Sequence, residues 1–87
     1  MTSLITEDTR IYALDDGGKL IAEIPFPMTQ PGVYTIDHTF VDASLRGQGM
    51  ADRLVRAALE QISALGGQPA ATCSYALSWL EKHPDRT

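Results

Sequence analysis

The chain has little cysteine, few cations and no long apolar run, and each shortage excludes a class of protein. Its 87 residues include one cysteine, Cys73, so an internal disulfide is impossible. No apolar stretch approaches the roughly 20 residues that a membrane-spanning helix needs. Residues 1–7 lack the basic start and the apolar run of a signal peptide. We therefore expect a cytoplasmic protein with a reduced thiol and no membrane partner.

Positive charge is also scarce, since 7 Lys and Arg residues stand against 11 Asp and Glu, for a net charge of −4. A general nucleic-acid-binding protein would carry a basic face, so we expect no nucleic-acid partner. An acidic surface favours a cationic partner instead, such as an amine or a basic peptide.

The rest of the composition is typical of a soluble globular domain, with 44% hydrophobic and 21% charged residues. A length of 87 residues predicts one domain, residues 1–87, because typical domains contain about 100–150 residues. The sequence contains no internal repeat and no linker. We expect a monomer or a weak homodimer without a metal site.

The first half of the chain has the pattern of three strands. The first is predicted at residues 9–14, and Asp-Asp-Gly-Gly at 15–18 is typical of a tight hairpin turn. Residues 19–26 alternate between apolar and polar, which is the period of a half-buried strand, and prolines end the run. After a further turn, a third strand is predicted at residues 33–41.

From Met50 the apolar period becomes helical, until glycine ends the helix after Leu65. Residues 69–73 are small or β-branched and predict a short fourth strand. Ser74 is predicted to cap a last helix over 75–82, which Pro84 stops. The apolar stripe of the first helix consists of Ala51, Leu54, Val55, Ala58, Leu59, Ile62 and Leu65.

This order of elements predicts an α+β fold. The strand, helix and strand between residues 33 and 73 fit a right-handed crossover, so the two strands should be parallel neighbours. The earlier strands are joined by hairpins and should be antiparallel. We predict a mixed, mostly antiparallel four-stranded sheet with one parallel pair and two main helices packed on it.

The loop before the first helix is suited to an anion. The first N–H groups of a helix have no partner within the helix, and the helix dipole adds positive charge there, so phosphate binds well. Gly47 and Gly49 remove the Cβ atoms that would keep a phosphate from the backbone, and Arg46 adds a cation. Neither a Walker A loop nor a Gly-x-Gly-x-x-Gly fingerprint is present. A glycine-rich connection without a ligand is the alternative.

The pattern Arg46-x-x-Gly49-x-Ala51 resembles the acyl-CoA signature of the Gcn5-related N-acetyltransferases, Gln/Arg-x-x-Gly-x-Gly/Ala. A small single-domain subgroup of that family is similar over residues 10–84. The shared segments are Asp-His-Thr-Phe-Val at 37–41, Leu-Arg-Gly-Gln-Gly-Met-Ala at 45–51, Cys-Ser-Tyr at 73–75 and Lys-His-Pro at 82–84.

The resemblance implies that acetyl-CoA is the co-substrate, with its pantetheine arm in a gap where the strands ending near Val41 and Cys73 splay apart. It implies that the pyrophosphate lies on the backbone of residues 46–51, and that an unknown amine or protein is the acceptor. A coenzyme-A-binding sensor or adaptor with little turnover is the alternative function. The cofactor-binding residues it implies are Phe40, Val41, Arg46, Gly47, Gln48, Gly49, Met50, Ala51 and Cys73.

Three side chains are candidates for the chemistry. His38 is a residue type that serves as a general base near neutral pH, or it is a histidine packed in the sheet. Cys73 lies beside a helix start, which can lower the pKa of a thiol; it is a nucleophile or a small residue lining the pantetheine site. The resemblance implies that Tyr75 could protonate the leaving thiolate, although the local motif differs from that of larger members.

Larger members of that family have two helices after the first strand, where this sequence has the turn at 15–18. Those helices help to build the acceptor pocket. We therefore expect a site that is open or completed by a partner.

Overall fold

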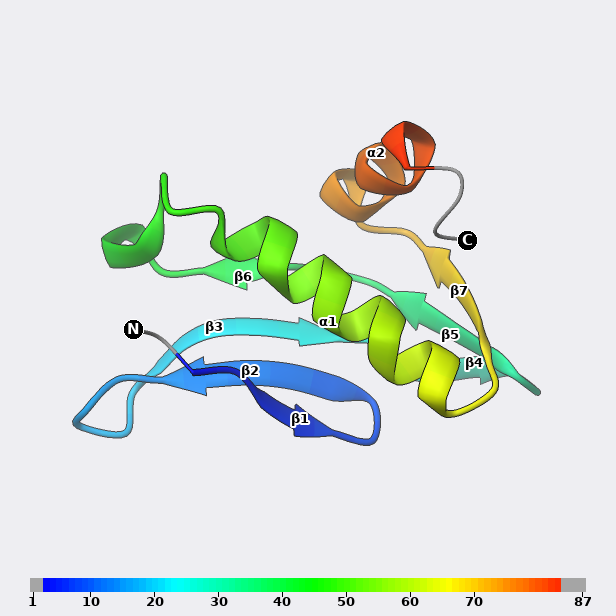
Figure 1. Cartoon of the computed structure of the whole chain (residues 1–87), viewed down its shortest axis with the longest axis horizontal. Coiled ribbons are helices and arrows are strands. Elements are labelled where there is room, and N and C mark those ends of the chain that lie inside the picture. The colour runs from blue at the N-terminus through cyan, green and yellow to red at the C-terminus, as the bar shows by residue number, and fades with distance from the viewer. Residues whose placement is uncertain (1–2, 84–87) are drawn as a thin grey trace.

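The computed structural model describes residues 3–83, which form two β-sheets, two α-helices and one short 3₁₀ helix (Figure 1). No helix in this range is long and apolar enough to cross a membrane. The strands of the first half are β1 (Ile5–Glu7), β2 (Arg10–Leu14), β3 (Leu20–Pro25), β4 (Met28–Gln30), β5 (Val33–Ile36) and β6 (Phe40–Val41). They are followed by the 3₁₀ helix η1 (Ala43–Leu45), α1 (Met50–Ala64), β7 (Gln68–Ala71) and α2 (Ser74–Lys82).

The strands form two sheets rather than the single four-stranded sheet that we predicted. The larger sheet has the order β1-β2-β3-β6, with every pair antiparallel. The smaller has the order β4-β5-β7, in which β5 and β7 are parallel and pair from Val33 with Gln68 to Ile36 with Ala71. The parallel pairing of β5 with β7, which α1 separates in the sequence, confirms the predicted parallel pair. The mostly antiparallel α+β class is also confirmed.

The predicted third strand, residues 33–41, is divided between the two sheets. Its first part, β5, pairs with β7, whereas its second part, β6, pairs with β3 through Ala22 opposite Val41 and Glu23 opposite Phe40. Residues 37–39 between them belong to neither strand. Both parts alternate in the same phase, so the sequence pattern does not reveal the break. The break leaves β6 and the chain after β7 on diverging courses (Figure 1).

Two short strands were missed by the sequence prediction. The residues of β1 and β4 are all exposed, so they have no alternation of apolar and polar residues to detect. Pro27 was expected to end the strand before it, and β3 does end at Pro25. The chain nevertheless remains in a sheet, because the Pro27 carbonyl accepts a hydrogen bond from the Thr35 N–H at 3.0 Å.

The main core lies between α1 and one face of the larger sheet. The predicted stripe of α1 is buried at five of its seven positions, and Ala51 is half-buried. The prediction is wrong for Leu65, which is 40% exposed because it lies at the C-cap, beyond the last turn of α1. Strand residues Ile11, Ala13, Ala22 and Ile24 pack with Leu54, Val55, Ala58, Leu59 and Ile62 of α1 in one buried cluster.

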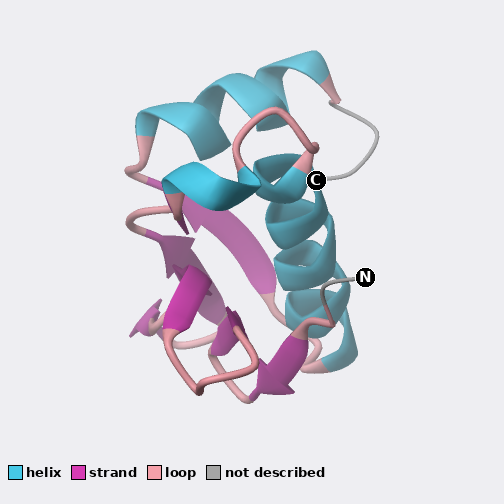
Figure 2. Cartoon of the chain, turned by 90° about the vertical axis from the view of Figure 1, so that its left-hand side faces the viewer, coloured by secondary structure: helices cyan, strands magenta, loops and turns pink. Residues whose placement is uncertain are grey.

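No helix covers the opposite face of the larger sheet among the residues that the structure describes (Figure 2). This surface carries the side chains of Arg10, Tyr12, Glu23 and Phe40, and we call it the open face.

The last helix starts one residue earlier than predicted. Cys73 has extended backbone angles and is the N-cap of α2, while Ser74 is already helical, so the prediction of Ser74 as cap is wrong. The thiol therefore lies at the helix N-terminus itself. Pro84, predicted to stop this helix, is outside the described residues.

Candidate active site

The glycine loop enters α1 in a geometry that only glycine adopts without strain. Gly47 and Gly49 have φ angles of +83° and +73°, in the left-handed region, and Gly49 is the N-cap of α1. A Cβ atom added at either position would meet no atom within 4 Å, so the backbone here borders open space. The N–H groups of the first turn of α1 therefore have room for an anion.

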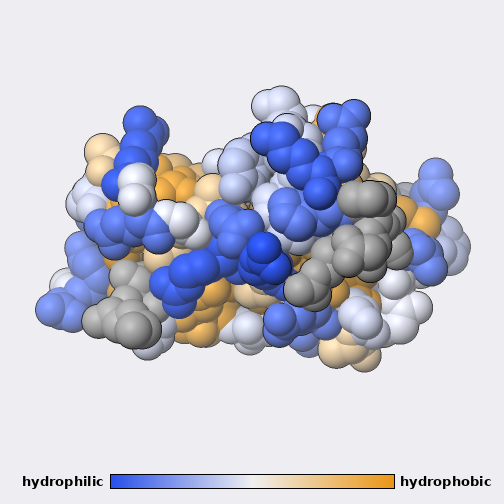
Figure 3. Space-filling view, turned by 45° about the horizontal axis from the view of Figure 1, so that its top comes forward, coloured by the Kyte–Doolittle hydropathy of each residue, from blue (hydrophilic) through white to orange (hydrophobic). Residues whose placement is uncertain are grey.

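A cavity of about 350 Å³ lies beside this loop. Its walls come from the segment entering β6, from the loop and first turn of α1, and from the first turn of α2. In the space-filling view of Figure 3, hydrophobic atoms are visible between the hydrophilic side chains of the helical side of the molecule. The lining residues are Thr39, Val41, Leu45, Arg46, Gly47, Gly49, Met50, Ala51, Asp52 and Tyr75.

Six of the residues predicted to bind the cofactor line this cavity, and three do not. Phe40 projects from the open face, where it lies opposite Glu23 and is 39% exposed. The Gln48 side chain donates to the Ser44 carbonyl at 3.3 Å and borders a different hollow, beside the turn between β2 and β3. Cys73 is outside the lining but contacts Thr39, which belongs to it.

The Cys73 thiol lies where α2 begins. Its Sγ atom is 3.6 Å from the Thr39 Oγ1 atom, and both residues are half-buried. Burial acts to raise the pKa of Cys73, but hydrogen bonds from the Ala76 N–H, the Thr39 hydroxyl and the Tyr75 N–H outweigh it. The net pKa lies below the ordinary thiol value, so the thiolate is more populated than in a free cysteine.

Tyr75 faces the cavity from the first turn of α2 and is 42% exposed. Partial burial, and then the negative charge of Asp52, raise the pKa of its phenol. Its hydroxyl group therefore carries its proton at neutral pH, as a proton donor must.

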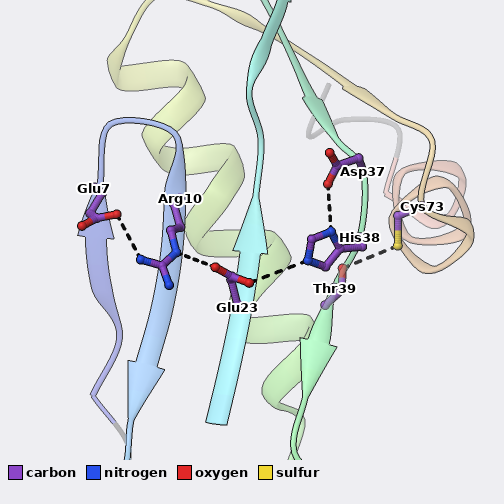
Figure 4. Close-up of polar contacts among 7 residues, drawn as sticks. All are labelled: Glu7, Arg10, Glu23, Asp37, His38, Thr39 and Cys73. Atoms are coloured by element: carbon purple, nitrogen blue, oxygen red, sulfur yellow. Dashed lines mark hydrogen bonds and ion pairs between the residues drawn. The ribbon is translucent and has the colours of Figure 1, made fainter. Parts of the chain in front are cut away.

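His38 is not among the residues that line the cavity, and its ring points toward Glu23 of the open face (Figure 4). The ring contacts the Asp37 carboxylate through Nδ1, at 3.0 Å, and approaches the Glu23 carboxylate through Nε2, at 3.7 Å. Glu23 also accepts a hydrogen bond from Arg10, which in turn contacts Glu7. The structure thus does not bring His38 into contact with Cys73: consecutive residues His38 and Thr39 point in different directions.

The sequence reasoning overlooked Asp52, which joins the two helices beside the cavity. Its carboxylate accepts hydrogen bonds from the Trp79 indole N–H at 2.6 Å and from the Arg56 Nε at 2.8 Å. The Trp79 bond first, and the Arg56 bond second, hold the pKa of Asp52 below its usual range. Trp79 is 4% exposed and stacks on the His83 ring at 3.9 Å. The i,i+4 spacing of Asp52 and Arg56 was the only available sequence signal.

Within residues 3–83, no three His, Cys, Asp or Glu side chains gather as a metal site would require.

A family model described as GCN5-related N-acetyltransferase matches residues 10–87. Among solved structures, a GCN5-like candidate N-acetyltransferase from Staphylococcus aureus is 30% identical, with a TM-score of 0.77 over 97% of this chain and 82% of its own. A Trypanosoma brucei acetyltransferase is 21% identical, with a TM-score of 0.55 over 86% of this chain and 61% of its own. Nourseothricin acetyltransferase is 22% identical, with a TM-score of 0.54 over 67% of this chain and 35% of its own.

The Trypanosoma brucei enzyme and nourseothricin acetyltransferase are only 21% and 22% identical to this chain, so their similarity shows the fold alone. No curated protein matches the chain. The family model, in contrast, covers most of the sequence, including the loop, both helices and the parallel strand pair. The chain therefore belongs to the Gcn5-related N-acetyltransferase family.

Proposed function

We propose that this protein is an acyl-CoA-dependent N-acyltransferase that transfers an acetyl group to an amine. One observation carries the proposal: a single cavity connects the glycine loop before α1 with Tyr75 and with Thr39, the neighbour of the Cys73 thiol. An acetyl-CoA molecule needs these features in this order, from its charged pyrophosphate to its thioester.

The loop end of the cavity suits the pyrophosphate. Backbone N–H groups at the start of α1 and the exposed Arg46 side chain supply donors and positive charge. Val41, Leu45 and Met50 contribute apolar surface further along, where the less polar pantetheine arm would lie. In this placement the thioester reaches the part of the cavity formed by Thr39 and Tyr75.

The chemistry requires a leaving group that receives a proton and an amine that loses one. Tyr75, with its raised pKa, is the proposed donor to the coenzyme A thiolate. His38 is the proposed base for the acceptor amine, because its neighbour Thr39 lines the cavity, so that an amine arriving from the open face would meet the thioester beside this histidine. Glu23 and Asp37, which lie beside that histidine, favour an acceptor that arrives as a cation.

A second candidate is a coenzyme-A-binding module with little turnover. The observation in its favour is that no described helix covers the open face, so nothing encloses an acceptor beside His38. Both candidates require the cavity to bind acetyl-CoA, and they differ only in whether the acetyl group is transferred.

Binding is tested first, by thermal denaturation with and without acetyl-CoA. A ligand at one hundred times its Kd adds about 2.7 kcal/mol to the free energy of unfolding. Gly49→Glu places a carboxylate in the anion site and should abolish the shift. Gly32→Glu is the matched control, because Gly32 has a similar φ of +76° and open space around it but lies in the β4–β5 turn. An equal ligand shift in both variants would refute the placement of the pyrophosphate.

Turnover is tested next, by following release of the coenzyme A thiol from acetyl-CoA with a panel of primary amines and lysine-rich peptides. Saturable release that depends on the amine supports the transferase. Binding without release above the uncatalysed rate, across the whole panel, would favour the module without turnover.

A further inference from the structure

We infer that Asp52 is a positioning residue for the transfer reaction: from the first turn of α1, it holds α2 in place so that Tyr75 lines the cavity. The inference rests on the proposed function, which makes Tyr75 the proton donor to the leaving thiolate. It assigns a role in the reaction to a carboxylate that the sequence reasoning did not single out.

The helix α2 has few buried side chains that could fix its position. Of its nine residues, Ala76 and Trp79 are the buried ones, and Trp79 is much the larger. The Trp79 indole N–H donates to the Asp52 carboxylate at 2.6 Å, across the junction with α1. A planar ring that is packed on its faces and bonded at its one polar atom has a single orientation, so this bond helps to fix the orientation of α2.

Tyr75 lies four residues before Trp79, and residues at this spacing share one face of a helix. The bond between Trp79 and Asp52 therefore also fixes the turn of α2 that carries Tyr75. Asp52 and Tyr75 both line the cavity, one from each helix. Asp52 thus determines how the proposed proton donor is presented to the cavity.

Asp52 is itself held on both of its oxygen atoms. One accepts from the Trp79 indole, and the other accepts from the Arg56 Nε at 2.8 Å, so the carboxylate has one orientation. Asp52 follows Gly49, the N-cap of α1, by three residues and belongs to the turn where the proposed function places the pyrophosphate. One carboxylate therefore connects the turn that would bind the cofactor to the helix that carries the proton donor.

The charge of Asp52 provides a readout that a role in stability alone would not change. Arg46 and Asp52 are the charged residues that line the cavity with Tyr75, and the Cys73 thiol accepts from the Tyr75 N–H at the start of α2. Partial burial, and then the charge of Asp52, raise the pKa of the Tyr75 phenol. Removing that charge, or releasing α2 so that the phenol becomes more exposed, should lower the pKa of Tyr75.

The first measurement is the ultraviolet titration of the Tyr75 phenol without acetyl-CoA. The chain has three tyrosines, so the Tyr75 signal is the difference between each protein and its Tyr75→Phe counterpart. The midpoint should fall in Asp52→Asn, which removes the charge but keeps an oxygen for the Trp79 indole, and should fall further in Asp52→Ala. Glu60→Gln is the matched control, because Glu60 is exposed on the same helix and does not line the cavity. A wild-type midpoint in both Asp52 variants would overturn the inference, whether or not acetyl-CoA binds.

The second measurement is the rate of transfer at saturating acetyl-CoA and amine, with the folded fraction of each variant set by circular dichroism. Asp52→Ala should lower the rate about 10- to 100-fold, as expected for a misplaced catalytic group, and Asp52→Asn should lower it less. The KM for acetyl-CoA should not rise, because the change removes negative charge from the site of an anionic ligand. Glu60→Gln should transfer at the wild-type rate.

The decisive comparison repeats Asp52→Ala in a Tyr75→Phe background. If Asp52 acts through Tyr75, its loss should cost almost nothing more once the phenol hydroxyl is gone, whereas a loss of folded protein would lower the rate equally in both backgrounds. Equal losses would overturn the positioning role and leave the proposed transferase intact. A Tyr75→Phe variant that transfers at the wild-type rate would overturn both the proton donor and this inference, and absence of acetyl-CoA binding would remove the proposed function as well.

Discussion

The two sides of the larger sheet differ in what covers them and in what their polar groups contact. On one side, α1 packs against the strands, α2 joins α1 through Asp52 and Trp79, and the glycine loop borders a cavity. On the open face, Glu7, Arg10, Glu23 and His38 interact with one another at the surface, without a helix over them (Figure 4).

Under the proposed function, this difference assigns the two substrates to different sides of the larger sheet. The side that α1 covers has a cavity lined by the glycine loop and by both helices, where the proposed function places acetyl-CoA. The open face offers a histidine and carboxylates at a surface that an amine can approach. We therefore interpret the two sides as the donor side and the acceptor side. If the two sides act separately, a substitution on one side should leave the function of the other unchanged.

The largest expected effect is on transfer, in His38→Ala. Loss of a general base lowers the rate of transfer about 100- to 10,000-fold, and acetyl-CoA binding should stay at the wild-type level because His38 does not line the cavity. Steady-state rates with a saturating amine, together with the ligand-induced thermal shift, measure the two quantities.

The chain has two histidines, so His83→Ala is the control for that experiment. His83 stacks on Trp79 at the end of α2, and its removal should alter stability more than the transfer rate. If His38→Ala weakened acetyl-CoA binding as strongly as it lowered the rate, the separation of donor and acceptor sides would be wrong.

The next effect is on stability, and it compares one aromatic residue from each side. Trp79 is 4% exposed, so Trp79→Ala should lower the free energy of unfolding by about 3–5 kcal/mol, the usual range for a buried aromatic. Phe40 is 39% exposed on the open face, and Phe40→Ala should cost about 1 kcal/mol or less. Urea denaturation monitored by circular dichroism measures both. Equal losses would mean that the open face is packed against something in solution, such as a second copy.

The sequence predicted the glycine loop and α1 better than the division of residues 33–41 between two sheets, for physical reasons. A glycine-rich loop before an amphipathic helix is a local feature, and the positive φ angles of Gly47 and Gly49 follow from that local chemistry. The division of residues 33–41 into β5 and β6 depends on which strands lie alongside, and pairing partners distant in sequence leave no mark on the local alternation.

The same limit applies to single side chains. Phe40 and Val41 were both assigned to the cofactor, but neighbours in a strand face opposite sides, so only Val41 lines the cavity. Asp52 was missed because its Trp79 partner is 27 positions further along the chain. The membership of the site residues in an active site stays a prediction, which the variants described here test.

The smallest expected effect is on the stability of the protein in acid, and it tests Asp52, which lines the cavity. The Trp79 and Arg56 bonds lower the pKa of Asp52 in the folded protein, so the unfolded chain binds this proton more readily. The stabilisation is therefore complete above the unfolded value of about 3.9 and is lost as the pH falls through the folded value. Asp52→Asn cannot titrate, so its melting temperature should fall less steeply than that of the wild type below about pH 4. Asp42 is the comparison, because hydrogen bonds from the Ser44 hydroxyl and N–H lower the pKa of its carboxylate. The melting temperature of Asp42→Asn should also fall less steeply in acid, without loosening the junction of α1 and α2. If the melting temperatures of Asp52→Asn and the wild type fell in parallel from pH 5 to pH 2, the Asp52 hydrogen bonds would be absent in solution. The argument that α2 is held beside the cavity would then be wrong.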